Sequence, residues 1–198
     1  MTKNVTKADV GEKSVIDAFD TQELFALARL DLERGAIEQA LQKIKRLLAD
    51  PEVPNEAIGM AGRLYAQLGL WDRAKDLFKK YLQLHPQAAT ESFQLGMVCF
   101  DAGQIDEALK VWGELLQKNP THPPALFYRS LALARNGKIA EARQNLDILL
   151  KSVPTDNLYF GRGKELLQSI DAQTNPAQAA AQKEPLPAIP KDVYKTEH

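Results

Sequence analysis

The chain has 198 residues, of which 44% are hydrophobic and 26% charged, a composition typical of soluble globular proteins. Its 25 basic and 26 acidic residues nearly cancel, which disfavours a nucleic-acid-coating protein. A single cysteine excludes an intramolecular disulfide framework, and no apolar run approaches the roughly 18 residues of a membrane span. Because the first ten residues are polar and do not resemble a secretory signal, we expect a cytoplasmic protein.

Glycine recurs at intervals of 34 residues, and other columns keep the same phase. The glycine column comprises Gly35, Gly69, Gly103 and Gly137. Five residues after each glycine stands an alanine, at Ala40, Ala74, Ala108 and Ala142. Proline closes three of the four copies, at Pro86, Pro120 and Pro154. Columns that stay in phase over four copies indicate a repeat protein.

Each copy has the pattern of two helices joined by a tight turn. Apolar residues recur at three- and four-residue spacing, which marks one helix face, and the glycine suits a turn with positive φ. The closing proline ends the second helix because it cannot continue it. The pattern predicts helices over residues 21–34, 37–49, 55–68, 71–84, 88–102, 105–118, 122–136 and 139–152. One helix pair cannot bury its own apolar face, so neighbouring pairs must stack.

Helix-start signals support these boundaries at two places. Asp20 followed by Glu23 predicts a capping box at the start of the first helix. Pro123 and Pro124 suit the first turn of the seventh helix, where a missing backbone N–H has no cost.

The second copy carries the fullest set of repeat residues, namely Gly62, Tyr65, Gly69, Trp71, Ala74, Phe78, Tyr81 and Pro86. In the first and fourth copies Ala28 and Ser130 replace the first-helix glycine, and both are small. This pattern resembles the tetratricopeptide repeat (TPR) family over about residues 21–154. The resemblance implies an all-α fold, namely a right-handed α-solenoid of antiparallel helix pairs, and a function in binding other proteins.

The resemblance divides the chain into three parts. We expect a solenoid over residues 21–171, with repeats at about 21–54, 55–88, 89–122 and 123–156 and a capping helix at about 156–171. Residues 1–20 are predicted to be a flexible segment with a short turn near 15–19. Residues 172–198 are rich in Ala, Pro and Gln and are predicted to be a disordered tail. Within it, residues 185–194 fit either a docking motif or a linker.

Titratable residues form no catalytic or metal-binding pattern that we recognise. Cys99 is predicted to face the interior of the third helix pair as a small hydrophobe. His85 and His122 lie in inter-repeat loops, without a second ligand at metal-binding spacing. Residues 161–164 lack the spacing of a phosphate-binding loop. We expect no enzyme activity, no cofactor and no bound metal.

The resemblance implies that the first helix of each repeat lines a concave surface through its second, fifth, ninth, twelfth and thirteenth positions. The apolar residues at these positions, which we expect to floor a binding groove, are Phe25, Phe93, Met97, Phe100, Phe127 and Leu131. Gly59 and Ala66 are small and would leave a hollow between the phenylalanines of the neighbouring repeats. The alternative is that some of these rings pack on the helix of the next repeat.

Two arginines, Arg29 and Arg63, share the ninth position of adjacent first helices. Side by side, they would either hold an acidic group of a partner or stay solvated. We therefore expect an adaptor that binds a peptide or amphipathic helix of a partner protein in this groove, as an assembly factor in a bacterial complex. The alternatives are a dedicated chaperone for an aggregation-prone client and a regulatory subunit acting on an enzyme in trans. Self-association remains open.

Overall fold

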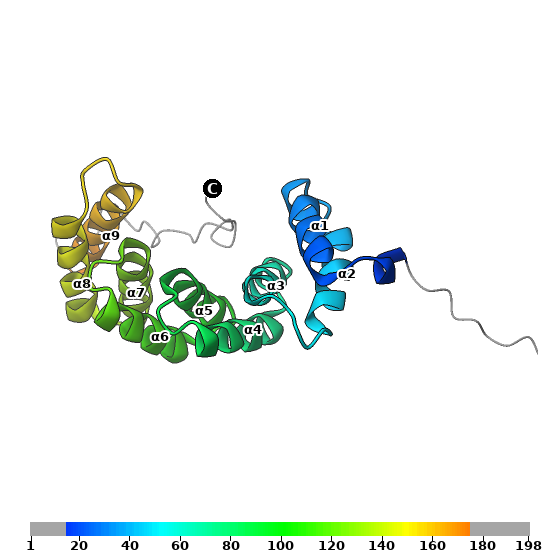
Figure 1. Ribbon diagram of the computed structural model, residues 1–198. Helices are drawn as coiled ribbons and strands as arrows, with labels where there is room; N and C mark the ends of the chain where they lie inside the picture. The colour runs from blue at the N-terminus through cyan, green and yellow to red at the C-terminus, as the bar shows by residue number, and fades with distance from the viewer. Residues whose placement is uncertain (1–14, 175–198) are drawn as a thin grey trace, which may run out of the picture. The chain divides into compact units, whose positions relative to one another are not determined.

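The computed structural model describes residues 15–174, and the regular elements in that range are all helices (Figure 1). They are η1 (Val15–Ala18), α1 (Thr21–Glu33), α2 (Ile37–Leu48), α3 (Asn55–Gln67), α4 (Trp71–Leu84), α5 (Ala89–Asp101), α6 (Ile105–Lys118), α7 (Pro123–Arg135), α8 (Ile139–Ser152) and α9 (Leu158–Thr174). Each of the eight predicted repeat helices is confirmed to within one residue at either end, and the predicted capping helix begins two residues and ends three residues later than expected. The predictions for residues 1–14 and for the tail from residue 175 lie outside the described residues.

The described helices group into two compact units, and the division falls between Ile58 and Gly59, inside α3. The first unit contains α1 and α2, which pack against each other as an antiparallel pair. The second contains the larger part of α3 and the helices α4 to α9. The sequence predicted a single solenoid over residues 21–171, so the division into two units is a feature that periodicity did not reveal.

The glycine column forms the turn inside every repeat. Gly35, Gly69, Gly103 and Gly137 all have φ between 71° and 76°, a left-handed conformation that favours glycine because it has no Cβ. In the first repeat the N–H of Ala36 donates to the carbonyl of Asp31 at 2.8 Å, which closes the end of α1 in a Schellman motif. The predicted turn is therefore confirmed in all four repeats.

Each helix pair packs by matching a small residue to a large one. In repeat three a Cβ placed on Gly96 would lie 2.2 Å from Nε1 of Trp112, and the fully buried indole donates to the carbonyl of Phe93 at 3.2 Å. In repeat two a Cβ on Gly62 would lie 3.0 Å from the ring of Phe78. Glycine thus stands where the partner residue is aromatic, and the helices approach closely because no side chain separates them.

In the second unit the helices alternate between two layers (Figure 1). The second helices α4, α6 and α8 line the outer side, and the first helices α5 and α7 lie on the concave side. From α4 to α9 contacts run from each helix to the next, and also between α5 and α7 and between α7 and α9. The concave layer is therefore built by helices that are consecutive in space but separated by a full repeat in sequence.

The helix α9 packs on the last repeat, as predicted for a capping helix. Leu166 and Ile170 are fully buried on its inner side, and Lys164 and Glu165 are exposed. A Cβ on Gly163 would lie 2.9 Å from Leu149, so this glycine allows α9 to approach α8.

Candidate functional site

The expected apolar floor of the groove is buried inside the second unit rather than displayed. Phe93 is only 6% exposed and packs against three rings of the following elements, with centroid distances of 6.4 Å to Trp112, 5.8 Å to His122 and 5.7 Å to Tyr128. These partners come from α6, from the N-cap of α7 and from α7 itself. Phe93 therefore belongs to the core between repeats three and four.

The remaining apolar residues of the predicted floor in this unit are buried as well. Phe100 is 7% exposed and lies 5.8 Å from the ring of Trp112, and Phe127 lies 5.2 Å from Tyr128. Met97 and Leu131 have no exposed surface. The expectation of an exposed apolar groove is corrected for these residues, because they are buried within the unit; Phe93 packs on rings of the next repeat, which was the alternative.

The predicted hollow beside Gly59 is also occupied. A Cβ added to Gly59 would meet the ring of Tyr81 at 3.4 Å and the guanidinium of Arg63 at 3.7 Å, so these two side chains already fill the space. Ala66 is buried as well. A small residue in the first helix therefore admits an intramolecular neighbour instead of leaving room for a ligand.

Charged side chains do lie on the first-helix layer. The Nη1 atom of Arg63 in α3 lies 3.1 Å from Oε1 of Glu91 in α5, and the two side chains are 21% and 14% exposed. Sequence reasoning assigned Arg63 to this surface but missed Glu91, whose only signal was an opposite charge 28 positions later. The structure thus gives Arg63 an intramolecular partner that a ligand would have to replace.

The residues predicted in repeat one belong to the first unit. Phe25 is half-buried and Arg29 is exposed on α1. Because Arg29 and Arg63 lie in different units, their pairing stays a prediction.

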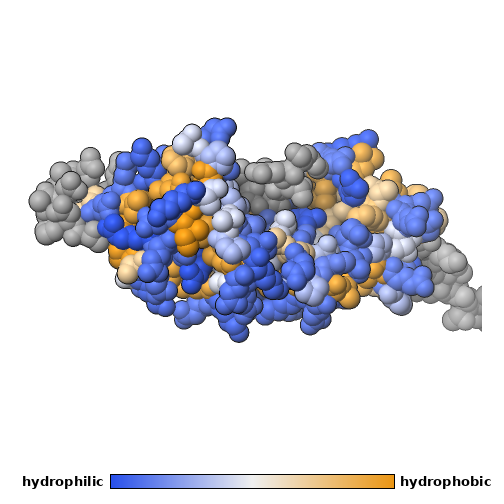
Figure 2. All heavy atoms as spheres, turned by 60° about the vertical axis from the view of Figure 1, so that its left-hand side comes forward, coloured by the Kyte–Doolittle hydropathy of each residue, from blue (hydrophilic) through white to orange (hydrophobic). Residues whose placement is uncertain are grey.

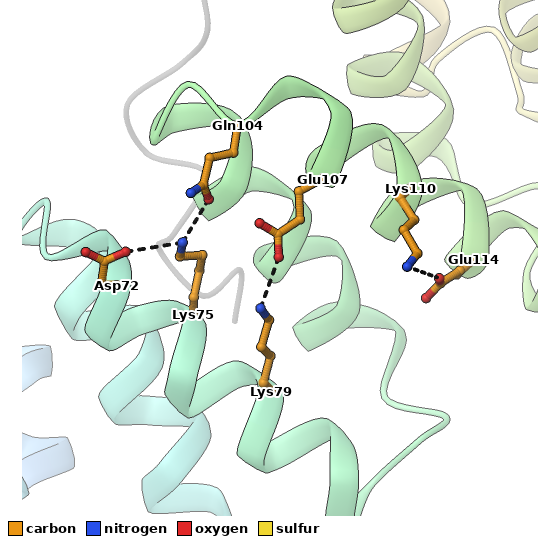
Figure 3. A network of polar contacts seen from close by, with 7 residues as sticks. All are labelled: Asp72, Lys75, Lys79, Gln104, Glu107, Lys110 and Glu114. Carbon is orange, nitrogen blue, oxygen red and sulfur yellow. Dashed lines mark hydrogen bonds and ion pairs between the residues drawn. The ribbon is translucent and has the colours of Figure 1, made fainter.

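On the outer side of the second unit, α4 and α6 are joined by a polar network (Figure 3). Lys79 binds Glu107 at 3.0 Å, and Lys75 reaches both Gln104 at 2.8 Å and Asp72 at 3.2 Å. The hydrogen bond to Lys79 lowers the pKa of Glu107, and the same bond raises the pKa of Lys79. These contacts tie repeat two to repeat three at exposed positions, where such pairs contribute little stability.

Two titratable groups that sequence analysis considered for chemistry have structural roles. Cys99 is fully buried, as predicted, and burial raises the pKa of its thiol to about 11, which keeps it protonated and unreactive. His122 is the N-cap of α7, where Nδ1 accepts a hydrogen bond from the N–H of Ala125 at 3.2 Å. Burial lowers the pKa of His122, which favours the neutral ring that this cap requires.

The described residues contain neither a candidate metal cluster nor a helix that could span a membrane. Within residues 15–174, His, Cys, Asp and Glu side chains nowhere gather in the groups of three that could hold a metal ion. Each helix in the same range is too short or too polar to serve as a membrane span. In the view of Figure 2 the surface is mostly hydrophilic, and apolar residues reach it in separate patches.

The repeat pattern and the stacked helix pairs define a class of protein, the helical-repeat scaffolds. The family model for the tetratricopeptide repeat matches residues 25–89 and 93–157, which is more than half of the chain. The chain therefore belongs to the tetratricopeptide repeat family, as its residues predicted.

Solved structures with the same fold are distant in sequence. A tetratricopeptide repeat protein from Parabacteroides merdae is 21% identical with a TM-score of 0.68, and the match covers 76% of this chain and 60% of that one. A double mutant of MamA RS-1 is 22% identical with a TM-score of 0.69, covering 81% and 88%. YrrB, described as a TPR protein with an unusual peptide-binding site, is 19% identical with a TM-score of 0.67, covering 76% and 77%. At these identities the likeness establishes the fold.

One curated relative carries an enzyme name. The probable biofilm formation methyltransferase WspC of Pseudomonas putida is 30% identical over 93 residues. The match covers 47% of this chain and 22% of that protein, so the chain spans about a fifth of the relative's length.

Proposed function

We propose that this chain is a non-enzymatic scaffold that binds a segment of a partner protein, and that the first-helix layer of the second unit is the binding surface. Membership of the tetratricopeptide repeat family supports protein binding in general. The observation that carries the choice of surface is the Arg63–Glu91 ion pair, which bridges two first helices at partly exposed positions. An assembly factor of a bacterial complex is one form that such a scaffold takes.

Recognition at this surface would be polar rather than apolar. Thr90 in α5 and Arg135 in α7 are exposed at predicted groove positions, and the guanidinium of Arg135 lies 5.8 Å from the centre of the Phe100 ring. The buried rings beneath them hold α5 and α7 rigidly, so these groups are presented without a large ordering cost.

The ion pair also suggests which chemical group the partner supplies. A guanidinium presents several N–H donors in a fixed fork, and a carboxylate matches that fork in a bidentate arrangement. Only Nη1 of Arg63 contacts Glu91 within hydrogen-bond distance. A partner segment bearing an acidic side chain would bind beside Glu91 or displace it.

The test compares two single charge removals. Arg63→Gln removes the proposed contact, and Lys80→Gln removes an exposed charge from α4 on the outer layer. Each variant and the wild type are used to capture partners from the source cells, and the affinity for each captured partner is then measured by calorimetry. Losing a hydrogen bond to a charged group costs about 1.5–3 kcal/mol, so Arg63→Gln should weaken binding roughly 10- to 100-fold. Equal binding by Arg63→Gln together with loss in Lys80→Gln would place the site on the outer layer.

A second candidate is a regulatory segment that acts on an enzyme. The observation that favours it is the match to a methyltransferase-named relative. If this function is correct, the captured partners include an enzyme whose rate changes when the chain is added back. The chaperone alternative loses its support, since the apolar residues that suggested it are buried.

A further inference from the structure

One face of α1 includes Leu30, whose equivalents in the later repeats are buried. Its members Glu23, Leu27, Leu30 and Arg34 are spaced by four, three and four residues, so they form a single stripe along the helix. We call these four residues the α1 seam. In the 34-residue register the positions equivalent to Leu30 are Leu64, Val98, Ala132 and Leu166.

The positions equivalent to Leu30 are buried in the later repeats, and Leu30 itself is not. Val98, Ala132 and Leu166 have no exposed surface, whereas Leu30 is 36% exposed. Leu27 is half-buried. Within residues 15–174 no helix pair precedes α1, so the first repeat presents a stacking face with no neighbour inside the described chain. An exposed leucine beside a half-buried one at such a face indicates a surface for another helix.

The last described helix of the second unit, α9, carries a charge at the corresponding small-residue column. The small column Ala28, Gly62, Gly96, Ser130 continues in register to Lys164 of α9, which is exposed. A second helix could not pack closely against that lysine without burying its ammonium group. Head-to-tail stacking of one copy's α1 on another copy's α9 is therefore disfavoured, and this leaves the α1 seam to pair with itself.

We propose that the α1 seam is a homodimer interface, in which α1 of one copy packs antiparallel to α1 of a second copy. In this arrangement Leu27 faces the Leu30 position of the other copy, and Glu23 faces its Arg34 position, because both pairs share one midpoint on the helix. Two-fold symmetry makes each contact twice. Glu23 and Arg34 are both exposed, although the Glu23 carboxylate also accepts the N–H of Asp20 in the capping box. Charge complementarity is therefore built into the seam.

The interface would be small, with one helix from each copy. Interfaces of this size lie at the low end of the range for specific association, so we expect a dimer with a dissociation constant of roughly micromolar order. Dimerisation should then depend on protein concentration.

The first test is sedimentation equilibrium of the full chain from about 1 to about 500 µM. Wild type should pass from monomer to dimer over this range. Leu30→Glu should raise the dissociation constant at least about 100-fold, because each dimer loses two apolar contacts and gains two buried charges. The matched control is Leu84→Glu at the end of α4, where the leucine is 52% exposed and lies outside the seam. A wild type that stays monomeric at about 500 µM, or equal weakening by Leu84→Glu, overturns the proposal.

A second test does not depend on the leucines and reports the direction of packing. Arg34→Glu places like acidic charges in both seam contacts, and Glu23→Lys places like basic charges there, so each variant alone should dimerise at least about tenfold more weakly at low salt. Mixed one to one, the two variants restore an opposite-charge pair at both contacts, and dimers should reappear. Failure of the mixture to recover, with helical circular dichroism intact in both variants, excludes the antiparallel seam.

Discussion

The close approach of α5 and α6 at Gly96 makes a single methyl group a severe perturbation. In Gly96→Ala the new Cβ would lie 2.2 Å from Nε1 of Trp112 and 2.5 Å from its Cδ1. The indole cannot move aside easily, since it is fully buried and its N–H donates a hydrogen bond to the carbonyl of Phe93. The substitution therefore forces either the helix pair apart or the indole out of its hydrogen bond.

The magnitude follows from three opposing contributions. Replacing glycine by alanine inside a helix favours folding by about 1 kcal/mol. Overpacking a core costs about 1–3 kcal/mol, and losing the indole hydrogen bond costs about 1 kcal/mol more. We expect Gly96→Ala to lower the free energy of unfolding by about 2 kcal/mol. Gly161→Ala in α9 is the matched control, because nothing lies within 4 Å of that Cβ, and it should be neutral or stabilising by up to about 1 kcal/mol.

Urea unfolding followed by circular dichroism measures both variants. The double variant Gly96→Ala/Trp112→Leu should show positive coupling, because a smaller partner removes the clash. Repeat four has the same combination in the 34-residue register, with Ser130 at the Gly96 position and Leu146 at the Trp112 position. If Gly96→Ala is as stable as Gly161→Ala, or if the double variant shows no coupling, the size-matching explanation is wrong.

Three further predictions concern titratable groups. Burial lowers the pKa of His122, and its neutral ring caps α7. The stability that the neutral ring contributes is therefore complete above the unfolded pKa of about 6.5 and is lost as the pH falls below that value. His122→Asn keeps a cap acceptor and should remove that part of the pH dependence of thermal unfolding. Cys99, with its pKa raised to about 11, should resist a thiol reagent at pH 8 in the folded chain and react quickly in urea, and rapid native labelling would show that the helix pair opens. Lys79→Ala should cost at most about 1 kcal/mol, with the loss shrinking at high salt, because the pair with Glu107 is half-exposed; a larger, salt-independent loss would contradict the surface assignment.

Local chemistry made most of the fold predictable. The capping box is present as expected, with the N–H of Glu23 donating to Asp20 at 2.8 Å and the N–H of Asp20 donating to Glu23 at 2.9 Å. The two prolines occupy the first turn of α7. These features depend on contacts within four residues, so their sequence signals are complete in one place.

The binding surface was predicted less well, because position in a repeat tells which face a side chain leaves from but not what covers it. Phe93 has the fifth position expected of a groove residue, yet rings from α6 and α7 bury it. Arg63 is paired with a carboxylate from the next repeat. Neither neighbour is marked by any local pattern.

The sequence by itself determined the repeat length, the helix boundaries and the glycine turns, since each is enforced by backbone geometry within one repeat. Only the tertiary structure decided the division within α3, the burial of the aromatic residues and the partners of the charged ones. Those features arise between repeats, where helices 28 to 35 residues apart in sequence meet, for example from Phe93 to Tyr128 and from Arg63 to Glu91. Their energies depend on how layers pack, and that packing is a property of the assembled array.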